Sequence, residues 1–128
     1  MIDTATDRIG SPVCDPALAT RTERGSIIAV LTGALDITRV PGLREQFLHL
    51  LRPASSRLVM DLSLVSHVDA DGLAFLVGTG RRARLLGGSL RLAAVTPAVG
   101  AALRVAGLDR LLEVFPTVQS AVSSPARA

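Results

Sequence analysis

The sequence predicts an α/β fold with a mixed, mostly parallel β-sheet of about five strands and about four helices packed on it. Runs rich in β-branched and aliphatic residues alternate along the chain with segments whose apolar residues recur at helical spacing. Gly and Pro stand at most boundaries between these segments. The predicted order is β-β-α-β-α-β-α-β-α, which favours parallel pairing with right-handed crossovers after the first two strands.

Composition narrows the classes of function. The chain has 128 residues, of which 48% are hydrophobic and 2% aromatic, so the core must be built from aliphatic side chains. A base-stacking platform for nucleic acid is not expected, and the net charge of +3 is spread among dispersed arginines and acids. All 14 basic residues are arginine, which excludes lysine-based chemistry.

The two ends of the chain are small and polar. We expect residues 1–16 to form a flexible tail, residues 17–122 to form one domain and residues 123–128 to form a C-terminal tail. The first residues have neither the basic region nor the apolar core of a signal peptide. Because no apolar run approaches the ~18 residues of a membrane span, we expect no membrane insertion and a cytoplasmic location.

The first half of the domain contains three strands and a helix. Residues 17–24 alternate weakly and predict an edge strand, which the Gly25-Ser26 turn connects to a buried strand over 27–32. A helix is predicted to start between Thr38 and Val40, with Pro41 in its first turn, and to end before Pro53. Residues 58–62 predict the next strand, and 63–68 a connection that leads into Asp69-Ala70-Asp71-Gly72.

The second half repeats the alternation. A helix is predicted over 71–86, and the arginines near its end are expected to complement the helix dipole. Gly87-Gly88 stops it. The remaining elements are a strand over 89–95, a helix over 97–106, a strand over 111–115 and one or two helical turns over 117–122.

Carboxylates follow two of the predicted strands. Asp36 follows one and Asp69 the other, so both are expected on the same rim of the sheet, where α/β folds place recognition sites. Aligning Gly72 with the invariant glycine of an EF-hand puts His67 and Gly78 at the two ends of the loop, where oxygen ligands are needed. No metal site is therefore expected.

The segment Asp69-Ala70-Asp71-Gly72-Leu73 is similar to the opening motif of the haloacid dehalogenase superfamily. That resemblance implies an aspartate nucleophile, a second aspartate as acid/base, and magnesium. The motif lies past the middle of this chain, and the lysine expected downstream is missing. An aspartate-dependent phosphatase is therefore the weakest of the interpretations.

More of the chain resembles the STAS domain family, named for sulfate transporters and anti-sigma factor antagonists. The resemblance covers residues 17–122, and its motifs are Gly33-Ala34-Leu35-Asp36, Leu62 through Leu73, Gly87-Gly88 and Val105-Ala106-Gly107-Leu108. It is greatest to the stand-alone bacterial anti-sigma factor antagonists. It implies a sheet with helices packed on it, and a non-enzymatic protein without a cofactor.

In that family a serine after the loop aspartate is phosphorylated by a serine kinase that is also the anti-sigma factor, and phosphorylation breaks the complex. Asp69 and Gly72 match the family residues, but Ala70 occupies the phosphoacceptor position, so this switch cannot operate. The resemblance implies a surface that binds an anti-sigma factor of the serine-kinase type. The predicted partner-binding residues are Asp36, Thr38, Ser66, His67, Asp69, Ala70, Asp71 and Gly72.

Several alternatives stay open from the sequence. At least one of Asp69 and Asp71 is expected to cap the following helix. Ala70 with Asp71 fixes either a permanently binding-competent protein, which we favour, or a mimic of the modified state. The alternative function is that of a non-catalytic STAS subunit of a transport or stress-signalling complex. A homodimer and phosphorylation of another hydroxyl also stay open.

Overall fold

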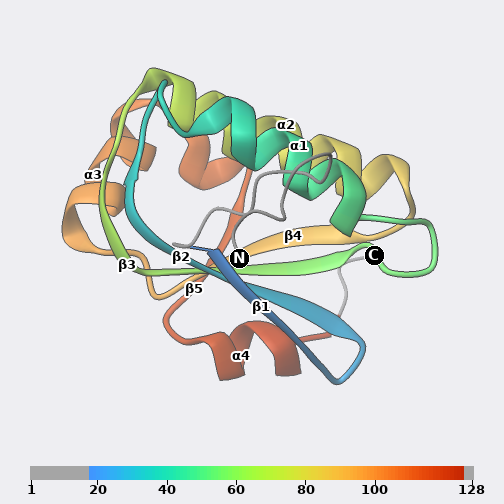
Figure 1. Ribbon diagram of the computed structural model, residues 1–128. Helices are drawn as coiled ribbons and strands as arrows, with labels where there is room; N and C mark the ends of the chain where they lie inside the picture. Colours follow the sequence, from blue (N-terminus) through green and yellow to red (C-terminus); the bar gives the residue numbers. More distant parts are fainter. Residues whose placement is uncertain (1–17, 126–128) are drawn as a thin grey trace, which may run out of the picture.

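A five-stranded sheet with the order β1-β2-β3-β4-β5 forms the centre of the protein (Figure 1). The computed structural model describes residues 18–125, so the expected N-terminal tail over 1–16 lies outside the described residues. The strands are β1 (Leu18–Glu23), β2 (Ser26–Leu35), β3 (Arg57–Val68), β4 (Ser89–Ala93) and β5 (Glu113–Phe115). β1 pairs antiparallel with β2, and every other pair is parallel, which confirms the predicted mixed, mostly parallel sheet.

Helices cover both faces of this sheet. They are α1 (Val40–Leu50), α2 (Ala70–Leu85), α3 (Pro97–Val105), the short 3-10 helix η2 (Leu108–Arg110) and α4 (Val118–Ser123). Helices α1, α2 and α3 lie on one face and α4 on the other (Figure 1). No helix within residues 18–125 has the length and apolar character needed to cross a membrane.

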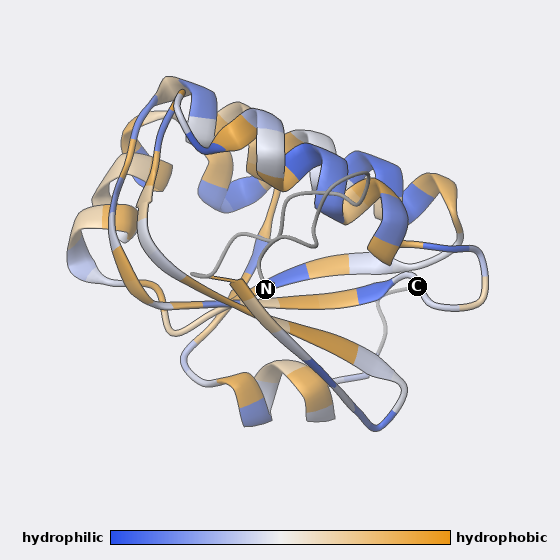
Figure 2. Ribbon diagram, viewed as in Figure 1, coloured by the Kyte–Doolittle hydropathy of each residue, from blue (hydrophilic) through white to orange (hydrophobic). Residues whose placement is uncertain are grey.

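Strand alternation divides the core between the two faces. In β2, Ile27, Ala29 and Leu31 point towards α1, α2 and α3, while Ile28 points towards α4. Hydrophobic residues accordingly predominate along the central strands, whereas α1 and α2 carry hydrophilic residues among hydrophobic ones (Figure 2). The larger core cluster is the one under α1, α2 and α3, and Phe47 and Phe75 contribute its aromatic rings.

The predicted connection over 63–68 is wrong, because β3 continues to Val68. The mostly buried first half of β3 is followed by Ser63 and Leu64, which are both exposed, and this irregularity concealed the second half of the strand. A register shift occurs here between β2 and β3. The Asp61 carboxylate accepts a hydrogen bond from the Ser63 N–H at 3.0 Å, so a side chain stabilises the irregularity.

Other boundaries differ by shorter stretches. β2 runs on to Leu35, β4 ends at Ala93, and η2 occupies residues that were not assigned to any element. Helix α4 ends at Ser123, inside the segment expected to be tail.

The Arg91 side chain connects β4 to the end of the described chain. It is 4% exposed and points to the α4 side of the sheet. Its guanidinium donates hydrogen bonds of 2.6, 2.7 and 2.6 Å to the carbonyl oxygens of Ala121, Ser124 and Pro125. It also pairs with the Glu113 carboxylate at 3.3 Å and lies over the Phe115 ring at 5.3 Å from the centroid. One buried cation therefore holds the carbonyl end of α4.

Candidate functional site

The ends of β2 and β3 extend beyond their neighbours in the sheet. β1 pairs with β2 only as far as Leu31, and β4 pairs with β3 only as far as Asp61. Beyond those points β2 and β3 pair with each other up to Leu35 and Val68, and both curve towards the start of α2 (Figure 1). We call residues 36–38 and 66–72, which lie at this end, the rim.

Asp69 joins the two segments of the rim. It is the N-cap of α2, and its Oδ1 accepts a hydrogen bond from the Gly72 N–H at 2.9 Å. Its Oδ2 accepts a second bond from the Ile37 N–H at 3.2 Å, across 32 positions of sequence. The Asp69 N–H donates to the Leu35 carbonyl at 3.1 Å. The predicted capping role is confirmed, and both carboxylate oxygens are bonded to backbone N–H groups.

Gly72 lets the first turn of α2 lie against the end of β2. A Cβ atom at this position would be 2.3 Å from the Leu35 carbonyl oxygen and 2.5 Å from the Val68 Cγ2 atom. Backbone cannot move aside as a flexible side chain can, so only glycine fits. The rim therefore depends on a close backbone contact as well as on the Asp69 bonds.

Asp36 organises the other segment of the rim. Its Oδ1 accepts hydrogen bonds from the Thr38 hydroxyl at 2.6 Å, the Thr38 N–H at 3.1 Å and the Arg39 N–H at 3.3 Å. The bond from the Thr38 hydroxyl is the largest cause that holds the pKa of Asp36 below its ordinary value of 3.8. Partial desolvation raises the pKa of Asp36, while the backbone hydrogen bonds and nearby His67 lower it further.

Replacing Thr38 with valine is expected to raise the pKa of Asp36 towards 3.8, because the largest cause of its depression is removed. A carboxyl pKa below its unfolded value stabilises the fold above that value, and this contribution is lost as pH falls through the folded pKa. The stability of Thr38→Val should therefore depend less on pH below 3.8. An NMR titration of the Asp36 carboxyl carbon measures the pKa directly.

Ser66→Ala is the matched control for that titration, because Ser66 is a rim hydroxyl that donates no hydrogen bond to Asp36. In Ser66→Ala, the pKa of Asp36 should equal that in the wild type. An unchanged value in Thr38→Val as well would contradict the assigned cause.

The structure brings the remaining predicted residues to the same rim. Ser66 and His67 are exposed in the last residues of β3. Ala70 and Asp71 are exposed in the first turn of α2, where the Asp71 carboxylate complements the helix dipole. No group of three or more metal-binding side chains comes together within residues 18–125. The rim is consequently a largely polar and mostly exposed surface held by internal hydrogen bonds.

Two residues of this region were not predicted. The Arg39 guanidinium donates hydrogen bonds of 2.7 Å to both the Thr32 and the Ala34 carbonyl oxygens, which lie on β2 past the end of its pairing with β1. Ile37 is 63% exposed between Asp36 and Thr38. A lone apolar residue between two polar ones in a turn was the available signal for Ile37, whereas nothing in the sequence indicated where Arg39 would reach.

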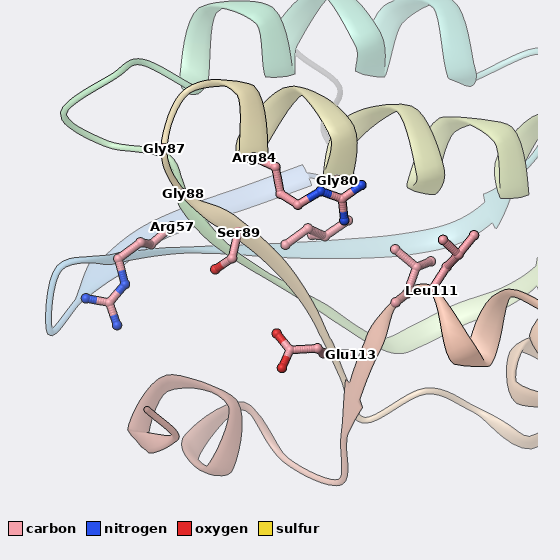
Figure 3. Close-up of a pocket in the computed structure, with 10 residues that line it drawn as sticks. Arg57, Gly80, Arg84, Gly87, Gly88, Ser89, Leu111 and Glu113 are labelled. Carbon is pink, nitrogen blue, oxygen red and sulfur yellow. The ribbon is translucent and has the colours of Figure 1, made fainter. Parts of the chain in front are cut away.

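A separate hollow of about 390 Å³ lies near the C-terminal end of α2, far along the helix from the rim (Figure 3). Arg57, Arg84, Ser89 and Glu113 contribute its polar side chains. The Arg57 and Arg84 side chains point in opposite directions, so they do not converge on a common ligand position (Figure 3). This hollow is therefore separate from the rim and not part of the same site.

Comparison with known proteins agrees with the fold. Residues 18–113 match the family model described as "Mlab, STAS domain". Among solved structures, an anti-sigma factor antagonist from Mycobacterium paratuberculosis has 23% identity and a TM-score of 0.74, covering 87% of this chain and 97% of that one. The anti-sigma factor antagonist SpoIIAA in its unphosphorylated form has 20% identity and a TM-score of 0.70, covering 83% and 93%.

A serine-to-glutamate variant of RsbS from Moorella thermoacetica has 27% identity and a TM-score of 0.69, covering 82% of this chain and 91% of that one. These structures share the fold described above. With the family model matching most of the chain, the protein belongs to the STAS domain family.

Proposed function

We propose that this protein is an anti-sigma factor antagonist-like regulator that binds an anti-sigma factor of the serine-kinase type through the rim. The observation that carries the proposal is the Asp69 carboxylate, which bonds to Ile37 on one rim segment and Gly72 on the other. A surface preorganised in this way loses little conformational entropy when a partner binds. The similarity to solved anti-sigma factor antagonists supports the same assignment. Such a partner implies a cytoplasmic location.

Ala70 defines how this regulator would differ from a switchable one. The residue is exposed at the first position of α2, directly after Asp69, and has no hydroxyl that a kinase could modify. Asp71 carries a single charge one residue later, whereas a phosphoserine carries about −1.5 to −2 at neutral pH. We therefore propose a protein that stays competent for binding and is not switched at this position.

Restoring serine at position 70 is expected to create a phosphoacceptor. The wild-type protein should bind its cognate kinase, found by mixing the purified protein with the serine-kinase anti-sigma factors of the same genome, and should take up no phosphate. Ala70→Ser should bind as well, then accept close to one phosphate per chain and lose at least about tenfold in affinity. Intact mass spectrometry measures the phosphate, and calorimetry measures the affinity.

Ala101→Ser supplies the matched control, because Ala101 is an exposed alanine of α3, outside the two rim segments, and should gain no phosphate. No binding of the wild type to any of these kinases would overturn the partner assignment. Stoichiometric phosphorylation of the wild type would instead show that another hydroxyl has taken over the switch.

A second candidate function is a non-catalytic STAS subunit of a transport or stress-signalling complex. Ala70 favours this alternative too, since a subunit that holds a complex together needs no phosphoacceptor. Copurification with such a complex, without binding to anti-sigma kinases, would identify it. The phosphatase interpretation has little support, because both oxygens of Asp69 accept backbone hydrogen bonds and the first turn of α2 depends on one of them.

A further inference from the structure

An apolar groove runs between α1 and α2 on the outer side of the helical layer. Its volume is about 190 Å³. Small-molecule sites usually occupy about 300–1,000 Å³, so this groove is too small for a typical ligand and fits protruding side chains. We call it the α1/α2 groove; its lining residues are Arg44, Phe47, Leu48, Leu51, Phe75, Gly78, Thr79 and Arg82.

Buried aromatic rings form the bottom of the groove, and its mouth is open. Phe47 and Phe75 are almost fully buried and meet edge to face, with ring centroids 5.5 Å apart. Leu48 is 50% exposed at the edge. A Cβ atom added to Gly78 would meet nothing within 4 Å, so the α2 wall has free space at this point. A bulky apolar side chain from another molecule can therefore enter at Gly78 and reach the aromatic bottom.

Positive charge flanks this apolar surface on both sides. Arg44 lines it from α1 and Arg82 from α2, and neither guanidinium forms an ion pair or hydrogen bond within residues 18–125. Glu45, the acidic residue of α1, is not one of the lining residues. Cations without partners beside an apolar groove complement a surface with acidic edges and an apolar centre.

The charge pattern around the groove indicates which kind of partner can bind there. A second copy docked groove to groove would bring the same arginines against each other, since a two-fold contact is self-complementary. A membrane surface is flat and cannot insert a ridge between two helices. An amphipathic helix presents such a ridge, with side chains at i, i+3, i+4 and i+7, and can carry acidic residues on both flanks.

We propose that the α1/α2 groove binds an acidic amphipathic helix of a partner protein. Apolar side chains of that helix enter the groove beside Gly78, and its flanking carboxylates pair with Arg44 and Arg82. The site is separate from the rim, because its residues come from later turns of both helices. The proposal for the groove consequently does not depend on whether the rim binds an anti-sigma factor.

A labelled model peptide tests the proposal. The probe is a fluorescein-labelled helical peptide with Leu at i, i+3, i+4 and i+7 and Glu on both flanks; its counterpart has Lys in place of Glu. Fluorescence anisotropy should show at least tenfold tighter binding of the Glu peptide at low salt, with the difference shrinking as salt is added. The double variant Arg44→Glu, Arg82→Glu should reverse the preference.

Groove-filling variants separate this site from general electrostatic attraction. Gly78→Phe places a ring in the groove and should weaken binding of the Glu peptide at least tenfold. Gly42→Phe is the matched control, because Gly42 is an exposed glycine of α1 with open space around it and does not line the groove. Circular dichroism should show both variants folded, and the rim variant Ala70→Ser should bind the peptide like the wild type.

Equal binding of the two peptides would overturn the proposal, as would equal losses in Gly78→Phe and Gly42→Phe. Binding to phosphatidylglycerol vesicles without binding to the Glu peptide would assign the surface to a membrane and overturn it too. A wild type that binds no anti-sigma kinase would affect the proposed function of the rim and leave these results unchanged.

Discussion

Replacing Gly72 with alanine should destabilise the protein by about 3 kcal/mol, the upper part of the usual range for overpacking a close contact. The added methyl group would lie 2.3 Å from the Leu35 carbonyl oxygen, so α2 must shift away from the end of β2. Such a shift lengthens the bond from Asp69 to the Gly72 N–H and disturbs the rim. Urea unfolding followed by circular dichroism measures the change in the free energy of unfolding.

Gly78→Ala is the control for this variant. Gly78 belongs to the same helix, but a methyl group there meets nothing within 4 Å. The substitution should stabilise the protein by about 0.5–1 kcal/mol, since alanine loses less backbone entropy in a helix than glycine. Opposite signs for the two Gly→Ala changes are therefore expected. Equal effects would mean that Gly72 is not needed for close approach.

Arg91→Ala should also cost about 3 kcal/mol of stability, because it breaks a buried ion pair and removes charged hydrogen bonds to three carbonyl oxygens. The loss should appear first at α4, whose carbonyl end loses its partner. Urea unfolding measures the total, and amide hydrogen exchange at Ala121 and Val122 reports the local effect.

Arg91→Lys should recover little of this stability, because a single ammonium cannot reproduce the planar fork that reaches Ala121, Ser124 and Pro125 together. Arg81→Ala serves as the matched control: Arg81 is an exposed arginine of α2, and its removal should change stability by less than about 0.5 kcal/mol. A loss in Arg91→Ala no larger than in Arg81→Ala would contradict the role assigned to the buried cation.

Much of the fold follows from local pattern. The β-branched run at 27–32 and the apolar spacing of α2 predict the strand and helix that the structure contains. The second half of β3 could not be predicted in the same way, because Ser63 and Leu64 are both exposed and break the period of two. Its strand state comes from pairing with β2, which is a long-range contact.

The site shows the same division. Asp69 as a helix cap could be expected from its place before an apolar helix, and the structure confirms it. Its bond to the Ile37 N–H could not, since 32 positions of sequence separate the two residues. The burial of Arg91 was equally unforeseeable, because an arginine inside a strand pattern gives no sign of which carbonyl groups it will meet.

The bridge that Asp69 makes between the two rim segments has a consequence for how these segments open. A segment held by its own bonds opens independently, whereas two segments sharing one carboxylate must release it in the same event. We therefore expect residues 36–38 and 66–72 to open together, although they are distant in sequence. A partner that contacts either segment is consequently affected by the state of both.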